Sequence, residues 1–121
     1  MKALFDTNIL IDHLNGIPQA RDELAQFQTR LTSIISWMAV LVGCREEDDE
    51  AVTRRFLEGF DVIPIDSNVA ERAVVLRRTN GIRLPDALIQ ATAERNNALL
   101  DTRNTKDFPS YLPGIRVPYE L

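Results

Sequence analysis

Acidic and amide side chains recur at points where the sequence predicts that buried segments of the chain end or begin. Asp6 and Asp101 each close a short apolar run, while Asp86 opens a helix-like segment. Asn104 and Asp107 follow shortly after Asp101. Hard cations such as Mg²⁺ and Mn²⁺ bind oxygen ligands of this kind and usually keep several waters. A cation held among these side chains could activate a water and neutralise charge on a scissile phosphate.

Each of these acids also has a purely structural interpretation. Asp6 could cap a helix that starts at Thr7, and Asp86 could be a first-turn acid that the helix dipole favours. Asp107 could be a turn residue, and Asp101 could be a partly exposed strand end. The choice between the two interpretations depends on whether the fold brings the side chains together.

Short apolar runs alternate with helix-like segments along the chain. The strands are expected at residues 2–5, 31–35, 62–65, 98–101 and 115–117. The helices are expected at residues 9–14, 18–28, 37–43 after a Ser36 cap, 46–59, 67–78 and 85–95. Pro64 favours an edge position for the third strand.

This alternation, without hairpin signals, predicts an α/β fold of three layers, with a central parallel sheet of about five strands flanked by helices. In such sheets a ligand binds beyond the carboxyl ends of the strands. The acids that follow strands should therefore meet at one edge.

Length and charge limit the class of protein further. The 121 residues suit a single domain spanning 1–121. A net charge of −4 argues against a protein that coats nucleic acid with a broad basic face. It is compatible with an enzyme that reaches phosphodiesters through a bound cation, which inverts the local field. We expect a cytoplasmic protein with no membrane segment, because no apolar run is long enough to span one and Asp6 comes too early for a signal peptide.

Three motifs resemble those of one known family. The segment 5–12, FDTNILID, is similar to the opening of PIN domains, where a strand ends in an aspartate followed by a Thr/Ser-Asn pair. The segments 84–93, LPDALIQATA, and 102–108, TRNTKDF, are similar to the third and fourth motifs of that family. Their order and spacing agree over essentially the whole chain. The resemblance is to the VapC-like branch.

The resemblance implies a Mg²⁺- or Mn²⁺-dependent endoribonuclease, the toxin of a type II toxin–antitoxin module. Its partners would be an RNA substrate, a cognate antitoxin protein and a second copy of the chain in a homodimer. Asp6 and Asp86 would be metal ligands, and Asn104 and Asp107 would orient a ligand or a water. The residues that would contact substrate are Thr7, Asn8, Thr102 and Arg103. Asp101 departs from the family, which often has an apolar residue there, and would add a possible further acid.

A second departure is at Ala39. The segment 36–43, SWMAVLVG, resembles the second motif of the family, in which a glutamate fills the position of Ala39. If Ser36 were the N-cap, a glutamate at residue 39 would complete a capping box and face the strand ends. Alanine offers neither, so we expect weak turnover or none. The alanine is either natural or a deliberate change that silences the enzyme.

Two other functions remain open from the sequence. A catalytically dead PIN domain could be kept for binding RNA or a protein partner, and a glutamate at residue 39 of the genomic copy would argue against it. A phosphotransfer domain could use Asp6 as its nucleophile. Asn8 breaks the Asp-x-Asp pattern of such phosphatases, and Met1-Lys2 lacks the acidic pair of receiver domains.

Overall fold

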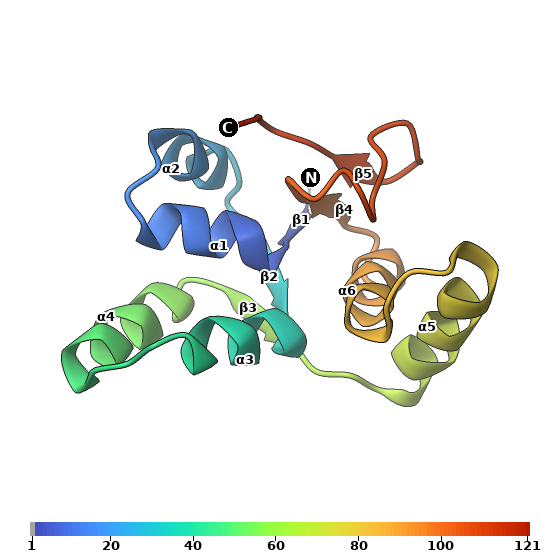
Figure 1. The fold of residues 1–121 in the computed structure, drawn as a ribbon, viewed down its shortest axis with the longest axis horizontal. Helices are drawn as coiled ribbons and strands as arrows, with labels where there is room; N and C mark the ends of the chain where they lie inside the picture. The colour runs from blue at the N-terminus through green and yellow to red at the C-terminus, as the bar shows by residue number, and fades with distance from the viewer. Residues whose placement is uncertain (1) are drawn as a thin grey trace.

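The computed structural model describes residues 2–121, which form a parallel sheet between two groups of helices (Figure 1). The strands are β1 (Ala3–Phe5), β2 (Arg30–Ser33), β3 (Asp61–Ile63), β4 (Leu99–Asp101) and β5 (Ile115–Arg116). The helices are α1 (Thr7–Leu14), α2 (Pro18–Ala25), α3 (Ile34–Val42), α4 (Glu47–Leu57), α5 (Ser67–Asn80) and α6 (Leu84–Arg95). The strand order is β3-β2-β1-β4-β5, and every pairing is parallel. The predicted three-layer α/β fold is confirmed.

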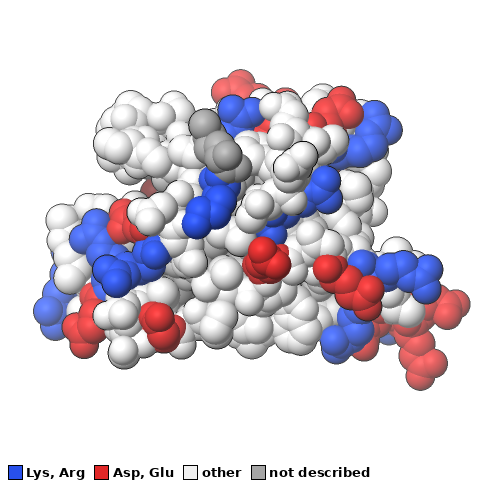
Figure 2. All heavy atoms as spheres, turned by 180° about the vertical axis from the view of Figure 1, so that it is seen from behind, with Lys and Arg blue, Asp and Glu red and all other residues white. Residues whose placement is uncertain are grey.

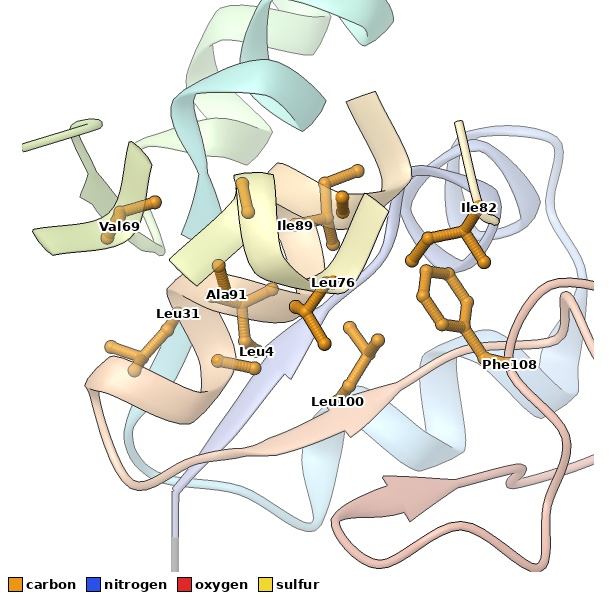
Figure 3. Close-up of a cluster of buried hydrophobic side chains, with 12 residues drawn as sticks. Leu4, Leu31, Val69, Leu76, Ile82, Ile89, Ala91, Leu100 and Phe108 are labelled. Atoms are coloured by element: carbon orange, nitrogen blue, oxygen red, sulfur yellow. The ribbon is translucent and has the colours of Figure 1, made fainter. Parts of the chain in front are cut away.

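β1 lies at the centre of the sheet and is buried on both faces. Successive side chains of a strand point to opposite faces. Leu4 accordingly packs with α5 and α6, and with Leu100 of β4 (Figure 3). Ala3 and Phe5 pack on the other face, with apolar side chains of α1, α2, α3 and α4. The all-apolar run before Asp6 is therefore a central strand whose last residue is delivered to the carboxyl edge.

Aromatic packing fixes the face that carries α1 to α4. The Phe5 ring meets Phe27 edge-on at 5.6 Å between centroids and Phe60 at 6.0 Å. Arrangements of this kind contribute about 0.5–1.5 kcal/mol each beyond the burial of apolar area. Phe5 precedes Asp6 directly, so this packing also holds the backbone of the candidate site in place.

Several element boundaries differ from the prediction, and one difference affects the site. β2 ends at Ser33, whose Oγ accepts a hydrogen bond from the Ile35 amide at 3.1 Å and caps α3. Ser36 was predicted to be the cap, but it is buried within the first turn of α3. The β-branched pair Ile34-Ile35 suggested strand, yet it forms the start of the helix. The capping-box argument for residue 39 was therefore wrong.

Other signals from the sequence agree with the structure. Asp66 caps α5 by accepting from the Val69 amide at 2.8 Å. Gly81 ends that helix in the left-handed region, at φ 71°, where glycine is favoured. β3 is an edge strand, as Pro64 suggested. Helix α2 is shorter than predicted and ends at Ala25.

The surface carries charges of both signs. The face seen in Figure 2 mixes basic and acidic side chains instead of presenting one broad basic surface. Among the helices of residues 2–121, none combines the length and the apolar character that crossing a membrane requires.

Candidate functional site

Asp6 lies where β1 meets α1, and it is only 3% exposed. Its amide donates to the Asp101 carbonyl at 2.9 Å, which ties it to β4. One carboxylate oxygen, Oδ1, accepts from the Thr7 amide at 2.7 Å and caps α1. The other, Oδ2, accepts from the Thr102 hydroxyl at 2.7 Å and from Asn8 Nδ2 at 3.2 Å. Asp6 is therefore a helix cap that is also held in one orientation by two further donors.

The loop after β4 is bonded to the start of α1. The Arg103 amide donates to Asn8 Oδ1 at 3.0 Å, and the Asn104 amide donates to Thr102 Oγ1 at 3.0 Å. Asn104 Nδ2 donates to Asp107 Oδ2 at 3.0 Å, and the Asp107 amide donates back to Asn104 Oδ1 at 3.3 Å. The polar residues at the start of α1 and in the loop after β4 thus form one hydrogen-bonded unit that sets the direction of the Asp107 carboxylate.

Asp86 brings a third carboxylate from the first turn of α6. Burial raises the pKa of Asp86, and the negative charges of Asp6 and Asp107 raise it further, against the opposing effect of Arg83. Burial also raises the pKa of Asp6, although the hydrogen bonds from Thr102, Thr7 and Asn8 oppose this. The charge of Asp107 also raises the pKa of Asp6, so the carboxylates of Asp6, Asp86 and Asp107 lie within electrostatic range of one another near the carboxyl edge of the sheet.

The side chains at this edge meet one of the needs of a divalent cation. They offer only oxygen donors, which suits Mg²⁺ or Mn²⁺, and carboxylates of like charge that lie near one another are stabilised by a cation between them. Within residues 2–121, however, no three His, Cys, Asp or Glu side chains are arranged so as to hold one ion. The carboxylates of Asp6 and Asp86 suit a cation chemically, and their role as its ligands stays a prediction.

Ala39 lies on the exposed side of α3. It lines a groove of about 210 Å³ together with Ile11 and Leu14 of α1 and Asp49 of α4, and none of the three converging acids lines that groove. One turn earlier on α3, Ser36 accepts a hydrogen bond from the Thr7 hydroxyl at 2.9 Å. Helical side chains lean toward the N-terminus of their helix. A longer side chain at position 39 would therefore extend toward Ser36 and Thr7, next to Asp6.

Asp101 was expected to be either a further acid of the site or a partly exposed strand end, and it is neither. Its side chain is fully buried, so it is no exposed strand end. The carboxylate lies 3.6 Å from Arg116 Nε. Arg116 in turn donates to both oxygens of Glu23, at 2.6 and 2.9 Å. Asp101 thus belongs to a cluster with Arg116 of β5 and Glu23 of α2 and lies apart from Asp6, Asp86 and Asp107.

The four residues predicted to contact substrate all take part in bonds within the site. The hydroxyls of Thr7 and Thr102 and the amide of Asn8 are used as described above. The guanidinium of Arg103 donates to both oxygens of Asp12, at 2.7 and 2.8 Å. Arg103 therefore fastens the loop to α1 instead of presenting free donors, and contact of these residues with substrate stays a prediction.

Two residues of this network were not identified from the sequence. Asp12 is buried on α1, one turn beyond Asn8, and also accepts from the Tyr119 hydroxyl at 2.8 Å. The spacing of Asn8 and Asp12 places them on one helix face, which could have pointed to Asp12. Tyr119 belongs to the C-terminal segment, which runs back toward α2 (Figure 1). Nothing in the local sequence indicates its contact.

Asp12→Ala is expected to lower the free energy of unfolding by about 2 kcal/mol, because Arg103 and Tyr119 both lose a charged partner. Tyr119→Phe removes only one hydrogen bond and should cost about 1 kcal/mol. Urea unfolding followed by circular dichroism measures both changes. A loss below about 0.5 kcal/mol for Asp12→Ala, the level of an ordinary surface substitution, would contradict the role given to this network.

Comparison with known proteins identifies the family of the chain. The sequence model of the PIN domain family matches residues 3–111. Ribonuclease VapC10 of Mycobacterium tuberculosis is 34% identical over 116 residues, which cover 89% of this chain and 86% of that protein. Ribonuclease VapC19 of the same organism is 33% identical over 126 residues, covering 96% and 98%.

Solved structures share the fold. A chain in a toxin-antitoxin complex from Klebsiella pneumoniae is 45% identical, with a TM-score of 0.93, and covers 98% of this chain and 99% of that one. A chain of DNA-bound VapBC from Salmonella typhimurium is 22% identical, with a TM-score of 0.83 and coverage of 99% and 98%, and supports the fold alone. The chain therefore belongs to the PIN-domain family and is VapC-like.

Proposed function

We propose that this chain is the toxin of a toxin–antitoxin module and that its site is built to hydrolyse RNA with Mg²⁺ or Mn²⁺. The observation that carries the proposal is the convergence of Asp6, Asp86 and Asp107 from three separate segments of the chain. The relatives named ribonucleases support the reaction class. We also propose that the chain, with alanine at position 39, cleaves RNA only weakly.

Each residue of the site has a separate role in the proposed reaction. Asp6 and Asp86 would hold the cation, and Thr102 and Asn8 keep the Asp6 carboxylate in one orientation. Asn104 directs Asp107, which would accept a hydrogen bond from a ligand or a water. When bound, the cation would activate a water and neutralise charge on the scissile phosphate. Hydrolysis in this manner would leave a 5′-phosphate and a 3′-hydroxyl.

The partners proposed are an antitoxin protein and a second copy of the chain. The Klebsiella pneumoniae relative was solved as a toxin-antitoxin complex, which supports the first. Exposed apolar side chains on the helices, among them Val74 and Val75 of α5, are compatible with the second. An RNA-cutting toxin of this kind would act in the cytoplasm.

The test of the proposal is cleavage of a long RNA in the presence of Mn²⁺ by the Ala39→Glu form. EDTA should abolish cleavage, and so should Asp6→Asn in that form, because the first removes the cation and the second one of its ligands. Ligation or labelling of the new ends should identify 5′-phosphates. Cleavage that persists in EDTA would overturn the metal-dependent mechanism.

A second function is favoured by one observation, the absence of a three-ligand cluster within the described residues. On this alternative the chain is a catalytically dead PIN domain that binds RNA or a protein partner. The Ala39→Glu form distinguishes the two. If it remains inactive on RNA but binds it, the binding function is supported.

A further inference from the structure

Arg83 lies directly before α6 and has the most loosely held guanidinium in contact with the candidate site. Its side chain is 80% exposed, and its Nη2 is 3.5 Å from Asp86 Oδ2. The two other arginines near this edge are held closely. Arg103 donates twice to Asp12, and Arg116 donates twice to Glu23, all within 2.9 Å. Arg83 therefore keeps most of its five donors free.

Stability does not explain an arginine at this position. Arg83 is the N-cap residue of α6, yet its side chain makes no capping hydrogen bond. Helices α1, α3 and α5 are capped by Asp6, Ser33 and Asp66 instead, as is usual. A positive charge at a helix N-terminus is disfavoured by the helix dipole. An exposed ion pair at this distance adds little in return.

The position suits an anion that approaches the carboxylates. Guanidinium groups bind phosphate through paired hydrogen bonds, and they lose little entropy in doing so because the fork is planar. An RNA strand must bring phosphates next to Asp86 for hydrolysis to occur there. A cation on Asp86 would repel Arg83, and the exposed side chain is free to turn toward a neighbouring phosphate.

We propose that Arg83 is a substrate-binding residue that contacts a phosphate of the RNA next to the one that is cut. Without RNA it rests against Asp86, and with RNA it moves to the phosphate. This role rests on the proposed ribonuclease function. It adds a residue outside the network of Asp6, Thr102 and Asn8 and explains a side chain that contributes little to the stability of the helix it precedes.

The chain as it stands allows a direct test, because the weak turnover expected from Ala39 permits binding to be measured without cleavage. A fluorescently labelled single-stranded RNA oligonucleotide is titrated in Mn²⁺ and followed by anisotropy. Arg83→Gln should raise Kd about tenfold, because one charge-assisted contact with the RNA is lost. The slope of log affinity against log salt should fall by about 0.7, as for one phosphate contact on a single strand. Arg83→Lys should recover part of the affinity, since it keeps the charge but loses the fork.

Arg21→Gln is the matched control. It removes the same charge from an exposed arginine on α2 whose partner is the adjacent Asp22, and it should change neither Kd nor slope. A measurable affinity that Arg83→Gln leaves unchanged would overturn the role of Arg83 alone. If none of the forms binds RNA at any salt concentration of the titration, the ribonuclease proposal is overturned, and the role of Arg83 with it.

Kinetics provide a second readout in the Ala39→Glu form. A phosphate beside the cut is bound equally in the ground state and the transition state, so Arg83→Gln should raise KM about tenfold and change kcat little. A fall in kcat at constant KM would assign Arg83 to the reacting phosphate. It would contradict the proposal that Arg83 contacts the neighbouring phosphate. Thermal melting should be the same with and without the substitution, because the side chain is exposed.

Discussion

Ala39→Glu is expected to raise the rate of Mn²⁺-dependent RNA cleavage by about 100-fold or more, because it restores a positioning group at a cation site. Position 39 lies one turn beyond Ser36, which is bonded to Thr7, the neighbour of Asp6. A glutamate there leans back along α3 and adds a carboxylate to the incomplete set of Asp6 and Asp86. Single-turnover cleavage of one RNA by both forms, at saturating protein, measures the difference.

Ala39→Gln provides the control for this experiment. It has the length of glutamate and can reach the same place, but it lacks the negative charge that attracts a cation. Its cleavage rate should stay within a few-fold of the alanine form, about the scale of a minor perturbation. Equal rates for the glutamate and alanine forms, on RNA that other VapC-like ribonucleases cut, would show that residue 39 takes no part in the site.

The same substitution should affect stability in a way that depends on the cation. A further carboxylate near Asp6, Asp86 and Asp107 adds repulsion in the metal-free protein, so the glutamate form should melt at a lower temperature. Added Mn²⁺ should narrow the gap, because a ligand that binds only the folded state stabilises it by mass action. Equal melting temperatures of the two forms at every Mn²⁺ concentration would argue against a carboxylate in the pocket.

The approximate place of the site could be predicted because it follows from topology. Alternating strands and helices require a parallel sheet, and the carboxyl ends of parallel strands share one edge. Asp6 and the loop after Asp101 are next to each other because β1 pairs with β4. Asp86 lies at the start of a helix, not at the end of a strand. Its position near this edge depends on the packing of α6 against Leu4 and Leu100.

Interactions between distant elements could not be predicted in the same way. Asp101 and Phe5 are direct neighbours in the sheet and point to one face, but the register that pairs them is visible only in the structure. Glu23 on α2 and Arg116 on β5 meet there from opposite parts of the chain. Periodicity shows that a residue belongs to a strand and leaves its partners across the sheet undetermined.

Local signals were ambiguous where two residue types support different elements. Ile34 and Ile35 are β-branched and favour a strand, whereas Ser33 and Ser36 both favour a helix cap. Tertiary packing decided in favour of Ser33, since Ile35 packs against the core that includes Leu4. The consequence was a shift of three residues in the position of the cap, which removed the capping-box geometry from residue 39.

The cluster of Asp101, Glu23 and Arg116 has a consequence for stability. Neither carboxyl oxygen of Asp101 has a hydrogen-bond donor among the described residues while the group is ionised. Burial raises the pKa of Asp101 to about 9, together with the negative charge of Glu23, and Arg116 only partly opposes this. Although burial alone would raise the pKa of Glu23, hydrogen bonds from Arg116 and Asp101 lower it. A pKa this high predicts that Asp101 is protonated at neutral pH and donates a hydrogen bond to Glu23.

Asp101→Asn is expected to make the protein more stable at neutral and alkaline pH. The folded chain keeps a proton on Asp101 up to about pH 9, whereas the unfolded chain releases it near the ordinary pKa of 3.8. Between these values folding takes up a proton, so the free energy of unfolding falls by up to about 1.4 kcal/mol per pH unit. Asparagine can donate a hydrogen bond to Glu23 without taking up a proton. Its free energy of unfolding should therefore lack this dependence on pH.

Urea unfolding of both proteins over roughly pH 5 to 8.5 measures the effect as two curves that diverge with rising pH. Asp101→Leu is the control, because leucine fills the space without donating to Glu23 and should be less stable than the asparagine form throughout. The divergence depends on the proton on Asp101 alone, since Glu23 and Arg116 keep their charges over this range. Parallel curves for the aspartate and asparagine forms would mean that Asp101 is ionised in the folded protein, with Arg116 shared between both carboxylates.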